Sequence, residues 1–204
     1  MRTAFLIDGF NLYHSIRDLL AAGTPPPLKW LDVPSLCRTI VKDSTLPSSA
    51  TVGEIHYFSA LATHRVAADP GVVTRHQALL RALKASGVQT HLGQFKRKSG
   101  GWEEKETDVA IGAMLLELYV RNAADAVMLV TGDTDLMPAF RTTKRLFPTS
   151  VIGFAFPYRR MNNSLRNVAD HHFSIRAHQY PKHQLPNPFV CMDGTEIHCP
   201  IDWL

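Results

Sequence analysis

The chain has 204 residues, of which 45% are hydrophobic and 20% are charged, so it can form one sizeable core and is not of the disordered class. The formal net charge of +4 permits a polyanionic partner but does not require one. No apolar run reaches the roughly 18 residues of a membrane span, the N-terminus lacks a secretory pattern, and three cysteines fit a reducing compartment. We therefore expect a cytoplasmic protein that does not bind membranes.

Stretches of strand and helix character alternate along the chain. Apolar runs predict strands at 3–7, 54–61, 88–95, 126–130, 150–156 and 172–175. Helical spacing of apolar residues predicts helices at 11–20, 32–42, 70–86, 105–121, 136–147 and 164–168, and residues 96–101 are expected to form a turn. This alternation indicates a three-layer α/β/α, Rossmann-like fold with a mostly parallel sheet.

The composition changes after Arg176. Pro181, Pro186, Pro188 and Pro200 interrupt any long element in the last part of the chain. We therefore expect one domain over residues 1–176 and a proline-containing extension over 177–204. The extension is expected to be extended in conformation, and its apolar residues to pack on the domain or on a partner.

Aspartates follow two of the predicted strands directly. Asp8 ends the run FLIDG, and Asp133 and Asp135 follow the run MLVTGDTD. If these strands are neighbours in a parallel sheet, the three carboxylates meet at its carboxyl edge, where such folds bind ligands. Clustered anions are costly without a cation, and hard oxygen ligands suit Mg²⁺ or Mn²⁺. The alternative is that these aspartates only form turns and helix caps, and Asp135 in particular could cap the helix that follows.

Asp108 is a candidate for a fourth carboxylate. It falls in the first turn of the predicted helix 105–121, where the helix dipole favours an anion. Lys105, three residues earlier on the same face, could contact a phosphate or remain solvated. The neighbouring Glu103, Glu104 and Glu106 leave the identity of the helical carboxylate open, although the expected helix phase turns them toward solvent. Asn11 could orient Asp8 or a metal-bound water, or cap the first helix.

An ordered set of short motifs resembles the NYN family, LabA-like members of the PIN-domain ribonuclease superfamily. The similarity runs from about residue 3 to 176, with Thr131 where the family often has Ser and Leu136 where it often has Phe. Its motifs are Asp8-Gly9-Phe10-Asn11, Lys105-x-x-Asp108, Thr131-Gly132-Asp133-Thr134-Asp135 and Ser164-Leu165-x-x-x-Ala169-Asp170. The resemblance implies a PIN-like fold and an Mg²⁺- or Mn²⁺-dependent endoribonuclease. It also implies that Asp8, Asp108, Asp133 and Asp135 are metal ligands, with Asn11 in the catalytic set.

Basic segments near strand ends are candidates for an RNA path. They comprise Lys96, Arg97 and Lys98 in the expected turn, and Arg159 and Arg160 after the fifth strand, with Thr131 and Lys105 as further candidates for substrate contact. A basic run beside an aromatic residue suits single-stranded RNA, although each residue could simply be solvated. The rival hypothesis is a non-catalytic RNA-binding or protein-interaction module on the same fold. The sequence leaves open whether a second copy or a regulatory protein binds the chain.

Overall fold

A computed structural model describes residues 1–99 and 101–204. Over these residues the central sheet has seven strands in the order β4-β3-β2-β1-β5-β6-β7, and only β4 runs antiparallel to its neighbour. The strands are β1 (Arg2–Asp8), β2 (Thr51–Ala60), β3 (Gln89–Lys98), β4 (Gly101–Lys105), β5 (Ala126–Val130), β6 (Val151–Phe156) and β7 (His171–Ser174). The prediction of a mostly parallel sheet is therefore confirmed.

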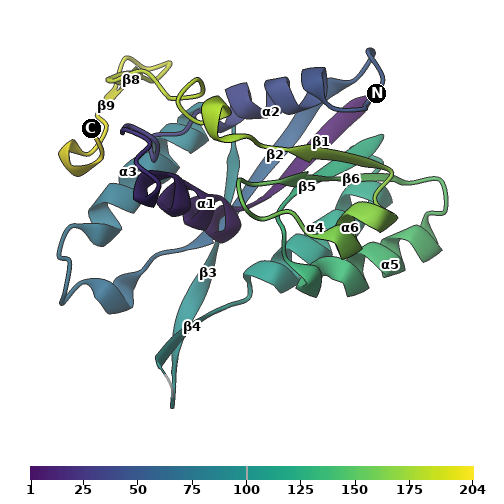
Figure 1. Cartoon of the computed structure of the whole chain (residues 1–204), viewed down its shortest axis with the longest axis horizontal. Helices are drawn as coiled ribbons and strands as arrows, with labels where there is room; N and C mark the ends of the chain where they lie inside the picture. The colour runs from purple at the N-terminus through teal and green to yellow at the C-terminus, as the bar shows by residue number, and fades with distance from the viewer. Residues whose placement is uncertain (100) are drawn as a thin grey trace.

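Helices cover both faces of this sheet (Figure 1). One face carries α1 (Gly9–Ala21), α2 (Val33–Asp43) and α3 (Val72–Ala85), and the other carries α4 (Thr107–Val120), α5 (Met137–Leu146) and α6 (Asn163–Val168). Side chains alternate along β1, so that Phe5 and Ile7 join the first core whereas Ala4 and Leu6 join the second. The three-layer α/β/α prediction is confirmed. Among the described helices, none combines the length and the apolar character that a membrane crossing requires.

The strand order reverses at β1, which places a ligand crevice at its carboxyl end. β1 lies between β2 and β5 and is parallel to both. Successive connections lead to one side of β1 up to β4 and to the other side from β5 onward, which creates a switch point. Gly9 allows α1 to begin directly after β1, because a Cβ at this position would lie 2.6 Å from the carbonyl oxygen of Phe58.

A β-hairpin replaces the turn that was expected at 96–101. β3 continues to Lys98 and pairs with β4, and the two strands extend away from the body of the domain (Figure 1). Apolar spacing did not predict this hairpin, because its side chains are largely charged and exposed on both faces. The following helix also begins later than expected, at Thr107. Glu106 adopts a left-handed conformation (φ 83°) between strand and helix, so Lys105 is the last residue of β4.

Residues 177–204 fold against the side of the domain that carries α1, α2 and α3. They form short 3₁₀ turns at Ala177–Gln179 and Ile201–Trp203 and a small hairpin of β8 (Phe189–Val190) and β9 (Glu196–Ile197). The Tyr180 hydroxyl lies 2.7 Å from the Ser15 hydroxyl on α1, and the Leu185 amide donates to the Trp30 carbonyl at 2.8 Å. The segment is therefore not extended. Its apolar side chains pack into the first core, that is, on the domain.

Candidate metal centre and adjoining cavity

Asp8 lies at the junction of β1 and α1 and is almost fully buried. Its Oδ1 accepts hydrogen bonds from the backbone amides of Phe10 and Asn11, both at 3.0 Å, and thereby caps α1. Its Oδ2 accepts from the Asn11 side-chain amide and, at 3.0 Å, from the Thr131 hydroxyl. A carboxylate has about four acceptor positions, so all of those of Asp8 are engaged by protein donors. Protein donors thus hold Asp8 at the predicted edge of the sheet, and its role as a direct metal ligand stays a prediction.

Asn11 and Thr131 connect the ends of β1 and β5. Besides donating to Asp8, Asn11 accepts a hydrogen bond from the Gly132 amide at 3.2 Å, and the Thr131 hydroxyl accepts from the Asp133 amide at 3.1 Å. Asn11 thus orients Asp8, one of the three roles considered for it. Thr131 is buried, and its hydroxyl contacts Asp8 and the backbone amide of Asp133; its contact with a substrate stays a prediction.

Three other aspartates present carboxylates close to one another at this edge of the sheet. One oxygen from each of Asp108, Asp133 and Asp135 lies within 4.8 Å of the other two, and we call these residues the acidic cluster. Asp108 comes from the first turn of α4, as predicted. Asp133, not Asp135, caps the 3₁₀ turn Thr134–Leu136, and accepts a hydrogen bond from the Asp135 amide at 3.0 Å. The carboxylate of Asp135 is therefore left free by the cap.

Glu104 is a further acidic residue at the site and was expected to face solvent. It lies on β4, where side chains alternate between faces, and it borders the same cavity as Asp8 and Asp108. Its carboxylate accepts hydrogen bonds from the Thr107 hydroxyl and from the Thr107 amide, the latter at 3.2 Å, which anchors the start of α4. The expectation was wrong because it applied the phase of the helix predicted from residue 105 to Glu104, which lies on a strand. Glu103 and Glu106 do lie at the exposed surface.

Within the part of the chain that the structure describes, no ion pair balances the negative charge of the acidic cluster. Among the described residues, no lysine, arginine or histidine forms an ion pair with Asp108, Asp133 or Asp135. Burial, followed by repulsion from Asp8 and Asp133, raises the pKa of Asp108 to about 6. An all-oxygen donor set with excess negative charge fits a hard divalent cation such as Mg²⁺ or Mn²⁺.

A cavity of about 770 Å³ opens beside the cluster, on the face covered by α1 and α3. Its acidic end contains Asp8, Glu104, Asp108 and Asp133. Residues of α1 line the middle of the cavity, and its other end is lined by α3 and by the C-terminal residues Asp202 and Trp203. The cavity is thus a candidate path for a ligand that reaches the acidic cluster.

The predicted basic residues of the hairpin lie outside this cavity. Across the hairpin, Lys96 is opposite Glu103, while Phe95 is opposite Glu104, so the lysines occupy the face opposite to the cavity-lining pair. Lys98 and Lys105 both form ion pairs with Glu103, and Lys96 forms one with Glu106. Lys105 therefore does not share a helix face with Asp108, because it belongs to the strand.

The second basic segment divides into two roles. Arg160 forms an ion pair with Asp18 of α1 at 2.6 Å, and its backbone carbonyl would clash with any Cβ at Gly132, at 2.0 Å. Arg160 therefore fixes the loop after β6 against α1 and the end of β5. Arg159 is exposed, with its guanidinium 5.3 Å from the centre of the Tyr158 ring, and its contact with RNA stays a prediction.

Comparison with known proteins agrees with this fold. The family model described as NYN domain matches residues 2–176. The chain belongs to the NYN family. This NYN chain is also similar in fold to the crystal structure of a protein of unknown function from Vibrio parahaemolyticus, with a TM-score of 0.62 and 18% identity, over 86% of this chain and 93% of the other. A search of curated proteins found no match.

The family match ends at residue 176. Apolar residues beyond it were expected to pack on the domain or on a partner, but none of them was predicted to border a cavity. The position of Glu104 could have been predicted from the sequence. If Gly93 to Lys98 and Gly101 to Lys105 are taken as a charged hairpin, the alternation of side chains along its strands sets the face on which Glu104 lies. Lys29 and Trp203 had no comparable signal. They meet at the cavity only because residues 177–204 fold back onto the NYN domain.

Proposed function

We propose that this NYN protein is a metal-dependent endoribonuclease that hydrolyses phosphodiester bonds of single-stranded RNA at the acidic cluster. The observation that carries the proposal is the approach of three carboxylates within 4.8 Å, none of which forms an ion pair with a described lysine, arginine or histidine. A fold whose switch-point edge gathers unpaired anions is suited to a divalent cation and a phosphate bound together. The family's nuclease character supports the same activity.

Asp108, Asp133 and Asp135 would hold Mg²⁺ or Mn²⁺ through their free oxygens. When bound, the cation would supply a nucleophilic water at neutral pH and neutralise charge that develops on the phosphate. Asp8 contributes negative charge from beneath the site, while Asn11 and Thr131 fix its orientation. Glu104 anchors the first turn of α4, which holds Asp108 toward the other two aspartates.

Cleavage of a circular single-stranded RNA tests the proposal and the endonucleolytic mode together. The purified protein, freed of metal with EDTA and supplied with Mn²⁺ or Mg²⁺, should linearise the circle, whereas Asp133→Asn should not. Glu106→Gln is the matched control. Glu106 is an exposed carboxylate two residues before Asp108, and it lies outside the acidic cluster. A wild-type protein that binds the circle but leaves it intact with both metals would instead support a non-catalytic RNA-binding module.

A further inference from the structure

The cavity has a cationic arm on the side away from the acidic cluster. Arg17 of α1, Lys29 from the loop before α2 and Arg75 of α3 all border it, so its charge changes sign along its length. His14, one turn before Arg17 on α1, lies on the stretch between the two ends. Arg17 follows Asp8 by nine residues along α1. At a rise of 1.5 Å per residue, the two are separated along the helix axis by roughly 13 Å. A flexible anionic chain of a few units can span that length.

Two of these cations lack a carboxylate partner. Arg75 is paired with Asp69 and, at 2.8 Å, with Asp202, but Arg17 and Lys29 form no ion pair with any described residue. Lys29 is half-buried, and burial together with the nearby Arg75 and Arg17 lowers its pKa. Arg17 is exposed and Lys29 is half-buried, and like charges held near one another favour an anionic ligand.

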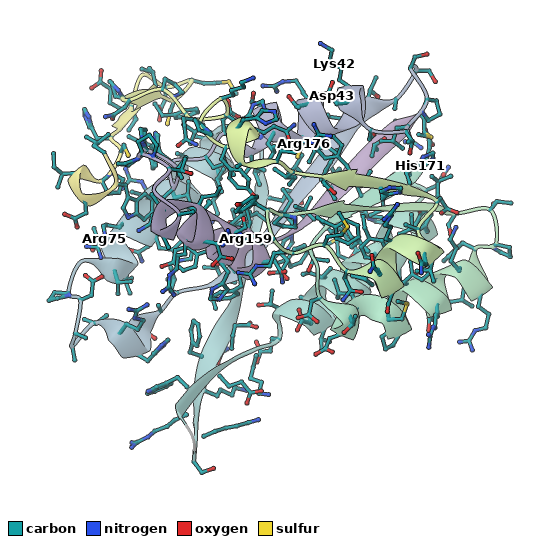
Figure 2. All side chains as sticks on the ribbon, viewed as in Figure 1. Lys42, Asp43, Arg75, Arg159, His171 and Arg176 are labelled. Atoms are coloured by element: carbon teal, nitrogen blue, oxygen red, sulfur yellow. The ribbon has the colours of Figure 1, made fainter. Side chains whose placement is uncertain are left out.

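The C-terminal residues form the wall of this arm. Asp202 is fixed by Arg75, which Figure 2 labels at the α3 side of the molecule, and the Trp203 ring lies 5.7 Å from the Lys29 Nζ. Trp203 thereby places an aromatic surface beside the free ammonium group. A cation next to an aromatic ring is a common arrangement for binding the phosphates and bases of single-stranded nucleic acid.

We propose that Arg17 and Lys29 bind backbone phosphates of the same RNA strand whose scissile bond lies at the acidic cluster, with Trp203 as the wall of this subsite. The inference rests on the proposed function for the identity of the strand. It differs from the path over the hairpin lysines, because Lys96 and Lys98 lie on the opposite hairpin face and are paired with glutamates. The cavity instead is bordered both by its cationic arm and by Asp108 and Asp133 of the acidic cluster.

The test is the salt dependence of RNA binding, measured by fluorescence anisotropy of a labelled 12-nucleotide oligouridylate in EDTA. Each lost phosphate contact reduces the log–log slope by about 0.7 for a single strand, so Arg17→Ala/Lys29→Ala should reduce it by about 1.4. The same relation gives an affinity loss of about 25-fold at 0.1 M salt. The matched control is Arg81→Ala/Lys84→Ala, which removes two exposed charges of α3 that do not border the cavity, and should leave the slope unchanged.

Three results would overturn the subsite. One is an unchanged slope and affinity in Arg17→Ala/Lys29→Ala with a wild-type melting temperature. Another is a larger loss in Lys96→Ala/Lys98→Ala, which would place the strand over the hairpin. The third is displacement of the oligonucleotide by equimolar uridine monophosphate, which would indicate a mononucleotide site. Because binding is measured without metal, a wild-type protein that binds but does not cleave contradicts the proposed function and leaves the subsite supported.

Discussion

The two ends of α4 hold clusters of ionisable side chains that follow opposite rules. At its start, Asp108 lies among other carboxylates, and burial and repulsion raise its pKa to about 6. At its end, Arg121 donates to Glu54 of β2 at 3.0 Å, and Glu54 also contacts the buried His56 at 3.0 Å. Burial alone would raise the pKa of Glu54, but hydrogen bonds from Arg121 and His56 lower it.

The difference separates a structural cluster from a ligand site. The charges around Glu54 are balanced within the protein, so this end of the helix is complete without a ligand. The carboxylates around Asp108 repel one another and are tolerated at the helix start partly because the helix dipole favours an anion there. An imbalance of charge, rather than the number of ionisable residues, therefore distinguishes the candidate metal centre.

The largest expected effect is on RNA cleavage. Asp108→Asn should reduce metal-dependent cleavage to background, because it removes a charged oxygen ligand while it preserves side-chain shape. Glu54→Gln, a substitution on β2 beside the other end of this helix, should retain most of the activity. Initial rates on a labelled single-stranded RNA in Mn²⁺ provide the comparison. Equal losses in both variants would mean that α4 acts as a whole and that the acidic end has no special role.

A smaller loss is expected for the residues behind the cluster. Asp8→Asn and Asn11→Ala should each reduce activity or metal affinity by roughly 10- to 100-fold, the range for groups that orient metal ligands. Asp8 belongs to this class because protein donors engage all its acceptor positions. The measurement is the Mn²⁺ concentration for half-maximal cleavage. Complete inactivation of Asp8→Asn at saturating Mn²⁺ would make Asp8 a direct ligand.

The fold and the acidic residues were largely predictable from sequence, whereas the cavity was not. Parallel strands that end in Asp8 and Asp133 place these residues at one edge, and the pairing of β1 with β5 confirms that geometry. Element boundaries failed where a charged strand resembles a loop, which misplaced Lys105 and Glu104. Long-range packing of residues 177–204 decides where Trp203 lies, and no local pattern contains that information.

Stability without metal should change in opposite directions at the two ends of α4. At pH 7, Asp108→Asn should stabilise the protein by about 1 kcal/mol. The rise in the pKa of Asp108 from 3.8 to about 6 corresponds to at most about 3 kcal/mol of stability. Because Asp108 is half-exposed, solvent screening reduces this value. Glu54→Gln should destabilise by about 1–2 kcal/mol through the loss of charge-assisted hydrogen bonds. Urea unfolding in EDTA measures both, and destabilisation by Asp108→Asn would indicate a structural role for that carboxylate.

The pH dependence gives the smallest but most specific signal. The pKa of Asp108 is higher in the folded protein than its ordinary value of 3.8, so the folded state binds the proton more tightly. Ionisation of Asp108 therefore destabilises the folded protein. This destabilisation is absent below about pH 4 and develops as the pH rises through about 6. The stability gap between Asp108→Asn and wild type should therefore close at pH 4 and reach its full value by pH 7. A gap that is independent of pH would exclude ionisation as its cause.

Calorimetric titration of Mn²⁺ into the metal-free protein tests the central claim most directly, because it requires neither RNA nor turnover. Wild type and Glu54→Gln should bind Mn²⁺ with similar affinity, and Asp108→Asn and Asp133→Asn should show little or no binding. Binding that survives in both aspartate variants would contradict the assignment of the acidic cluster as the metal centre.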